Sequence, residues 1–315
     1  RSDDSWTDRG KVTDGRYHTG PAPRASRTAP MPHASTLVLG AGMTGLAAGC
    51  ASGGIVLERE QRPGGICTSY YVRPGSAERL PHAPPDGEAY RFEVGGGHWI
   101  FGGAPDVLAM IDEVAPFSRH ARRSSVYFPS TGRYAGFPIQ HNLRDLGPEL
   151  AERALAEIVS ARPGEPRTMA DAIAGTFGAT LTASFFAPFQ SAYTAGLWTS
   201  IAPQDGYKTP VSIAEVERGA RGASAPTGYN VTFAYPGGGL DAVARALAGR
   251  CDVRYGADVR GIDAVGRTVT LATGSTWTYD TLLSTLPLDR TLAISGVAVD
   301  ARPDPATGVM VLNLG

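Results

Sequence analysis

Three glycines and one acid have the spacing of a site for a phosphate-bearing ligand. Gly40, Gly42 and Gly45 follow an apolar run at residues 37–39 in the pattern G-x-G-x-x-G. The first permits a tight turn, the second lets a pyrophosphate approach the backbone, and the third allows close packing of the following helix, whose N-terminus favours anions. Glu58 follows a second apolar run, 18 residues after Gly40, and can accept hydrogen bonds from a ribose diol. This order predicts dinucleotide binding, and glycine-rich turns in an unrelated α/β unit are the alternative.

Two further glycine clusters suggest that backbone lies against a large, flat ligand. Gly64 and Gly65 come soon after the acid, and Gly96 and Gly97 directly precede His98. Small residues allow such an approach, although a plain turn explains them equally. His98 is either a functional residue or a hydrogen-bonded core histidine. We take it as a candidate catalytic residue.

Lys208 is a second candidate catalytic residue. Only one other lysine, Lys11, occurs in a chain that otherwise uses arginine. A compact ammonium group can contact a phosphate or a flavin. A solvated charge on a loop is the alternative.

The elements that must position these residues alternate between strands and helices. Apolar runs predict strands, glycine and proline mark turns, and helical periodicity is clearest over residues 143–197. Thr168 and Asp171 predict a capping box that opens one of these helices. The strands are expected at residues 37–39, 55–57, 90–94, 124–128, 133–137, 229–235, 253–259, 268–272, 276–279, 282–287 and 308–315. Helices are also expected at 106–114 and 240–247.

Polar and aromatic groups in the middle of the chain form candidate ligand contacts. The amides around Gln140 can recognise a nucleobase edge or tie a loop. Residues 185–193 are aromatic enough to be core, and their alternative role is one wall of a cleft.

Composition limits the class of protein. The chain has 315 residues, is 42% hydrophobic and carries a formal net charge of −1, so we expect a globular protein and neither a nucleic-acid nor a membrane partner. No apolar run suggests a membrane span. Cys50, Cys67 and Cys251 lack a C-x-x-C pattern, which indicates packing residues in a reducing cytoplasm and no metal site. Residues 1–30 have no apolar periodicity, and we expect a flexible leader or upstream-translated sequence.

Together these motifs resemble the flavoprotein superfamily of amine oxidases, protoporphyrinogen oxidases and UDP-galactopyranose mutases. The resemblance is nearest to the mutase branch and covers about Leu37 to Gly315. It rests on Glu58 with the PGG sequence that follows it, and on the motifs GAGMTGL, GGHWIFG, FPIQHNL, FFAPF, YPGGG and LLSTLP.

The resemblance implies FAD as the cofactor, with NAD alone as the competing ligand. It implies an α/β fold in which a Rossmann-like FAD-binding domain carries an inserted helical lobe and a small antiparallel sheet. The cofactor would be held by Gly40, Gly42 and Gly45 at the pyrophosphate, Glu58 at the ribose, Gly64 and Gly65 toward the flavin, Gly96, Gly97 and His98 near its ring, and Gly238 of YPGGG. The FAD-binding domain would comprise residues 31–116 and 229–290, the sheet 117–142 and 291–315, and the helical lobe 143–228.

For activity, the resemblance implies a biosynthetic mutase that exchanges the pyranose and furanose forms of a nucleotide sugar with reduced flavin. Gln140 matches the family's base contact, whereas Gln190 and Tyr193 stand where the family has Asn and Trp beside the substrate. Pro210 stands where the mutases have an arginine that holds the diphosphate, so Lys208, Arg218 or Arg221 would have to replace it.

Two other readings stay open. One is an FAD-dependent oxidoreductase of the amine-oxidase or protoporphyrinogen-oxidase type. The other is an incomplete flavoprotein that acts as a binding subunit, because the family has a further flavin-binding segment beyond the position of Gly315. We therefore expect a small-molecule substrate and either a homo-oligomer or a completing subunit.

Overall fold

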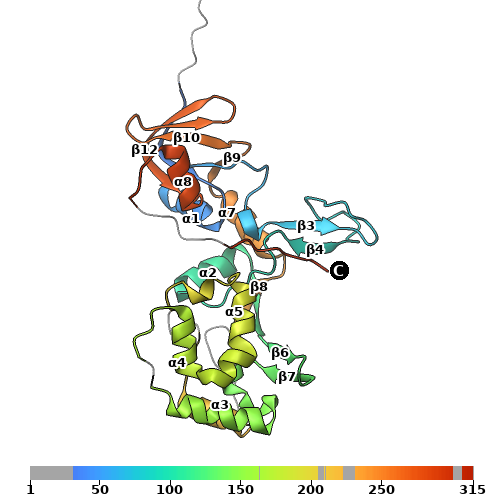
Figure 1. The fold of residues 1–315 in the computed structure, drawn as a ribbon. Helices are drawn as coiled ribbons and strands as arrows, with labels where there is room; N and C mark the ends of the chain where they lie inside the picture. The colour runs from blue at the N-terminus through green and yellow to red at the C-terminus, as the bar shows by residue number, and fades with distance from the viewer. Residues whose placement is uncertain are drawn as a thin grey trace, which may run out of the picture.

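A six-stranded sheet forms the centre of the first part of the molecule (Figure 1). The computed structural model describes residues 31–162, 164–204, 209, 211–222, 231–300 and 307–314. The strand order is β10-β11-β12-β1-β2-β9, in which β9, β2, β1 and β12 are parallel and β10 and β11 continue antiparallel. The strands are β1 (His33–Leu39), β2 (Ile55–Leu57), β9 (Asp252–Arg254), β10 (Val259–Asp263), β11 (Thr268–Leu271) and β12 (Thr276–Ser284).

Alternation along β1 places side chains in two separate cores. Leu37 and Leu39 face one side of the sheet, and Val38 faces the other, as the two-residue period of a strand requires. On the Val38 side the sheet is covered by α1 (Met43–Ser52) and α7 (Leu240–Ala248), with α2 (Pro105–Val114) packed on α7. On the Leu37 side α8 (Leu288–Ser295) packs on β10. The α/β class expected from the sequence is confirmed.

The second part of the molecule is a lobe of helices with its own core. Its main helices are α3 (Pro148–Ser160), α4 (Met169–Leu181), a π-helical turn (Thr182–Phe186), α5 (Ala187–Tyr193) and α6 (Ile213–Ala220). Short 3-10 turns at Ile139–His141, Leu143–Leu146 and Leu197–Thr199 complete it. The hairpin β6 (Ser125–Phe128) and β7 (Arg133–Gly136) packs against this core through Phe128 and Ala135. The Thr168–Asp171 capping box is present, as predicted.

One helical run in this lobe, Met169–Tyr193, is long and apolar enough by length and composition to cross a membrane, among the residues that the structure describes. This differs from the expectation that no apolar run is long enough to span a membrane. The backbone leaves helical geometry at Gly178, where φ is +75°, and Phe177, Leu181 and Phe185 are buried in the core of the lobe. Packing against α3 accounts for the apolar residues of this run that are buried, whereas Phe189 and Tyr193 are exposed.

Two small antiparallel pairs complete the described fold. β3 (Ser69–Val72) pairs with β4 (Tyr90–Glu93), and β5 (Phe117–Ala121) pairs with β8 (Thr232–Pro236). In Figure 1, β3 and β4 project to one side where the two parts meet, and β8 lies at the junction. A bridge between Ile100 and Ala234 extends the second pair. A 3-10 turn, Gly65–Cys67, leads into β3.

Several strand predictions were wrong, because sequence patterns do not show which strands become partners. The expected strand at 253–259 divides into β9, which pairs in parallel with β2, and the start of β10. The runs 276–279 and 282–287 are mostly one strand, β12. The second half of the expected antiparallel sheet, 291–315, instead contains the end of α8, and residues 307–314 form no strand within the described chain. β5 takes its partner from β8, which had been assigned to the FAD-binding domain.

Candidate functional site

The turn after β1 has the geometry that its glycines predicted. Gly40 has φ of +95°, a conformation that L side chains rarely adopt, and its N–H donates to Leu57 O at 2.8 Å. A Cβ on Gly45 would lie 1.8 Å from Gly40 O, so only glycine lets α1 pack this closely on the turn. A Cβ on Gly42 would meet no atom within 4 Å. Gly42 thus borders open space, whereas Gly45 packs inside the fold.

The N-terminus of α1 is suited to an anion. Its N-cap is Gly42, the first turn holds no acidic residue, and no side chain of the described residues caps it. The first N–H groups of a helix need external acceptors, and the helix dipole adds positive potential at that end. A ligand phosphate beside Gly42 would meet both requirements.

Glu58 links the glycine turn to the end of β2. The side chain is 8% exposed; Oε2 accepts from Ala41 N at 2.6 Å and Oε1 from Glu60 N at 2.9 Å. Each carboxylate oxygen has two lone pairs, so each can accept one more hydrogen bond. Glu58 lines the cavity described next, where such donors would be ribose hydroxyls.

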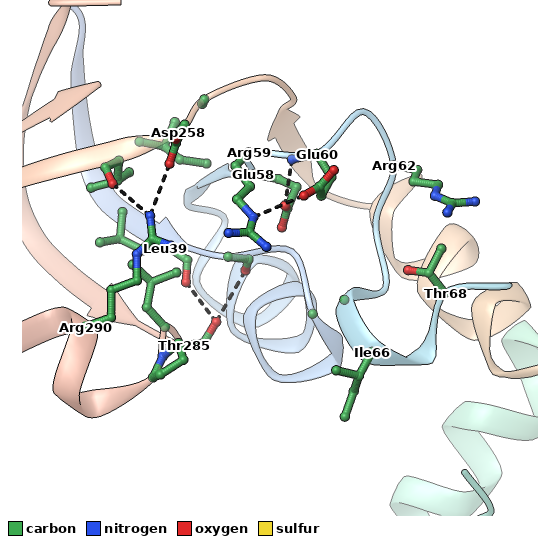
Figure 2. Close-up of a pocket in the computed structure, with 18 of the residues that line it drawn as sticks. Leu39, Glu58, Arg59, Glu60, Arg62, Ile66, Thr68, Asp258, Thr285 and Arg290 are labelled. Carbon is green, nitrogen blue, oxygen red and sulfur yellow. Dashed lines mark hydrogen bonds and ion pairs between the residues drawn. The ribbon is translucent and has the colours of Figure 1, made fainter. Parts of the chain in front are cut away.

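A cavity of about 690 Å³ extends along the carboxyl ends of β1, β2 and β12 (Figure 2). Arg290 closes one end and pairs with Asp258 at 3.2 Å, while Ile66 and Thr68 lie at the other end. Ile66 is 63% exposed and adds to the apolar surface of the cavity. The lining also includes Gly40, Gly42, Leu39, Leu57, Glu58, Arg59, Glu60, Arg62, Gly65, Arg79, Val94, Ala257, Val259, Thr285, Leu286 and Pro287.

The second glycine approach lies against the first. Gly64 N donates to Ala41 O at 2.8 Å, and Gly42 and Gly64 form a parallel bridge. Gly64 has φ of +115° and Gly65 of +55°, and Gly65 lines the cavity. The two glycine motifs, far apart in the sequence, therefore form one continuous wall.

The loop that contains Gly96, Gly97 and His98 follows Val94, which lines the cavity, but none of these three residues lines it. Gly95 N donates to Ile66 O at 3.0 Å, which ties the loop to the cavity wall. His98 Nδ1 lies 2.8 Å from Gly96 O. Because a carbonyl only accepts, Nδ1 carries the proton, and in the neutral ring Nε2 is left as a proton acceptor.

Glu93 organises this loop. It is 8% exposed and accepts from His98 N at 2.9 Å and from the Tyr235 hydroxyl. Burial, together with the hydrogen bond to Glu93, raises the pKa of Tyr235 to about 12. The side chain of Asn313 reaches the same loop, donating to Tyr70 Oη at 2.8 Å and toward Glu93 O at 3.4 Å.

The candidate substrate residues lie in the helical lobe and outside the cavity. Gln140 is 2% exposed, and Gln190 is 7% exposed, with an Oε1 that has no partner among the described residues. Tyr193 is 68% exposed and stacks on Phe189 at 5.6 Å between ring centroids. Lys208 lies outside the described residues, and Gly238 lies in the turn between β8 and α7, away from the cavity lining. The roles of all these residues remain predictions.

Arg218 and Arg221, the two arginines considered as replacements for the family's diphosphate-binding arginine, have different surroundings. Arg218 pairs with Glu215 within α6. Arg221 lines a separate cavity of about 560 Å³ with Arg133 and Arg144, next to α3. The structure therefore does not bring either of them into the cavity beside the glycine turn.

Sequence reasoning missed Thr285, Asp258 and Arg290. Thr285 Oγ1 donates to Leu39 O at 2.8 Å and covers Gly40. Its position shortly after the apolar pair Leu282 and Leu283, in the LLSTLP motif, was an available signal. The Arg290 and Asp258 pair joins α8 to the start of β10, and no local pattern marks it.

Comparison with known proteins agrees with this arrangement. The family model described as "Flavin containing amine oxidoreductase" matches residues 54–295. A search of curated proteins found no significant sequence match.

Several solved structures are similar to the chain over more than four fifths of its length. A reduced UDP-galactopyranose mutase has a TM-score of 0.71 at 23% identity, covering 83% of this chain and 57% of that one. An oxidoreductase from Methanosarcina mazei has a TM-score of 0.51 at 18% identity, covering 84% and 62%. A redesigned putrescine oxidase has a TM-score of 0.46 at 18% identity, covering 82% and 59%. The chain spans a little under two thirds of the length of these proteins.

Proposed function

The chain belongs to the flavin-containing amine oxidoreductase family, and from this premise we propose that it is an FAD-dependent mutase that interconverts the pyranose and furanose forms of a nucleotide sugar. FAD is the cofactor, and the cavity fits it. Gly42 borders open space where a pyrophosphate would approach, α1 offers uncapped N–H groups, and Glu58 has acceptor capacity left for a ribose. Gly65 and Ile66 would lie toward the flavin end.

The observation that carries the mutase proposal is the exposed aromatic surface on α5. Phe189 is 45% exposed and stacks on Phe185, and Tyr193 stacks on Phe189 with the rings 10° from parallel. Aromatic faces stack on nucleobases and bind the apolar face of sugars. Gln190 on the same helix is 7% exposed, and its unpartnered amide oxygen is buried, so it does not belong to this surface. A nucleotide sugar offers a base and an apolar sugar face to these rings.

Bound reduced flavin would supply a nucleophilic ring nitrogen for the exchange of ring forms. The protein residues would orient the sugar and move protons. His98, with Nδ1–H held by Gly96 O, presents Nε2 as a proton acceptor. Glu93 fixes the loop that carries it, by accepting the His98 N–H.

Product analysis tests this proposal directly. The FAD-loaded, dithionite-reduced protein is incubated with a panel of nucleotide sugars, and furanose products are resolved by chromatography. We expect ring exchange without net oxidation. Tyr193→Ala should raise KM about tenfold through the lost stacking, and Tyr193→Phe, which keeps the ring, should stay near wild type. Absence of any furanose product with loaded, folded protein would refute the mutase.

An amine-oxidase type of oxidoreductase is the second candidate, and the family match itself favours it. Here the bound flavin would accept a hydride from a C–N or C–C bond. Anaerobic bleaching of the flavin by an amine or a hydroaromatic compound, with hydrogen peroxide release in air, would identify this activity. Protein that binds FAD but gives neither result would instead be a binding subunit.

A further inference from the structure

Two cysteines that are distant in the sequence meet beside the dinucleotide-binding unit. Cys50 lies on α1 and Cys251 directly precedes β9, and their Sγ atoms are 2.7 Å apart. A disulfide bond is about 2.05 Å long. Both thiols also lie near Leu247 O, at 3.4 and 3.2 Å, and Cys251 Sγ lies 3.3 Å from Leu46 O. The two sulfurs therefore point at one another in a shared half-buried site.

The fold itself brings them together. α1 packs against α7, and the chain turns after α7 so that β9 can pair in parallel with β2. Gly49 allows this close approach: a Cβ there would lie 2.5 Å from Val56 and 3.5 Å from Cys251 Sγ. Cys67, the third cysteine, is in the 3-10 turn Gly65–Cys67 and takes no part in the contact.

We propose that Cys50 and Cys251 are a site of reversible intramolecular disulfide formation. A hydroperoxide is the oxidant. It converts one thiol to a sulfenic acid and releases one water or alcohol; the second sulfur then attacks the first, forming the S–S bond and releasing water. Two thiol hydrogens and two electrons leave the protein, and the O–O bond of the peroxide is reduced.

The surroundings of the two thiols determine how readily they react with an oxidant. Burial raises the pKa of the Cys251 thiol to about 12, and its hydrogen bond and charge interaction with Cys50 add to this shift. The reactive thiolate is scarce at neutral pH, so the reduced pair is stable against weak oxidants. Once formed, the bond would close a loop between residues 201 positions apart and hold α1 to the start of β9. Restricting the unfolded chain in this way stabilises the fold.

Thiol counting on the full chain tests the proposal. After hydrogen peroxide treatment, denaturation and alkylation, we expect one free thiol, on Cys67, where the reduced protein has three. Peptide mapping without reductant should find the peptides of Cys50 and Cys251 joined, and dithiothreitol should restore three thiols. The oxidised protein should also show a higher Tm than the reduced protein.

Three cysteine-to-serine variants show which cysteines form the cross-link. Cys67→Ser is the matched control and should form the cross-link as wild type does, whereas Cys50→Ser and Cys251→Ser should not. If either of these fails to fold, the wild-type peptide map still decides. Recovery of separate, alkylated or singly oxidised Cys50 and Cys251 peptides from treated wild type would overturn the proposal. None of these readouts depends on flavin activity.

Discussion

The substitution Gly42→Ala should weaken FAD binding without destabilising the apoprotein. Gly42 has φ of −69° and ψ of 175°, which alanine adopts without strain, and its Cβ would meet no protein atom within 4 Å. The apoprotein should therefore be stabilised by about 0.4–1 kcal/mol, because alanine restricts the unfolded chain. The added methyl group enters the space through which the pyrophosphate would reach the backbone.

The expected loss of FAD affinity follows from that contact. Losing one hydrogen bond to a charged phosphate costs about 1.5–3 kcal/mol, which corresponds to an increase in Kd of about 10- to 150-fold. The Kd is measured by quenching of FAD fluorescence, and apoprotein stability by urea unfolding.

Two other glycine-to-alanine substitutions serve as controls for Gly42→Ala. Gly45→Ala places a Cβ 1.8 Å from Gly40 O and should destabilise the apoprotein by about 1–3 kcal/mol or more. Gly261→Ala on β10 makes only a 3.7 Å contact with Thr270 and lies outside the cavity lining, so FAD binding should not change. An unchanged Kd for Gly42→Ala would show that the pyrophosphate does not bind at this turn.

Three further substitutions test other parts of the argument. Glu58→Gln replaces one acceptor by a donor facing a backbone N–H, and should cost about 1–3 kcal/mol in urea unfolding and weaken FAD binding. Tyr235→Phe removes the hydroxyl bonded to Glu93. Because the folded pKa of Tyr235 is raised from 10.0 to about 12, its contribution to stability is present below pH 10 and lost as pH rises toward 12, so the variant should flatten the alkaline arm of the wild-type stability curve. Thr168→Ala breaks the capping box with Asp171 and should lower the free energy of unfolding by about 1 kcal/mol, whereas Thr168→Ser should retain it; a neutral alanine variant would argue against the cap.

Several local motifs could be predicted from the sequence because local backbone requirements produce them. The glycine turn and the acid after β2 lie within one short segment of the chain, and the two residues of the capping box in the helical lobe are three positions apart. The continuous apolar run at residues 37–39 correctly indicated a buried strand, and its side chains lie in the cores on both faces of the sheet. The helical lobe followed from periodicity over many residues.

Strand partners and long-range polar pairs could not be predicted in the same way. β9 and β10 are short and similar in composition, yet β9 pairs in parallel with β2 and β10 is antiparallel to β11. The Arg290 and Asp258 pair depends on where α8 docks. The meeting of Cys50 and Cys251 depends on the packing of α1 against α7, so spacing alone indicated only packing residues.

The position of β12 also sets an order for the assembly of the chain. β12 lies next to β1 in the middle of the sheet, and Thr285 bonds to Leu39 across a separation of 246 residues. During synthesis β1 therefore has an open edge until residues 276–284 have emerged, while the helical lobe, built from contacts closer in sequence, can already fold. The unpaired backbone groups of an exposed strand edge can pair with strands of other chains. The glycine turn should become competent for its cofactor only after nearly the whole of the described chain has been made.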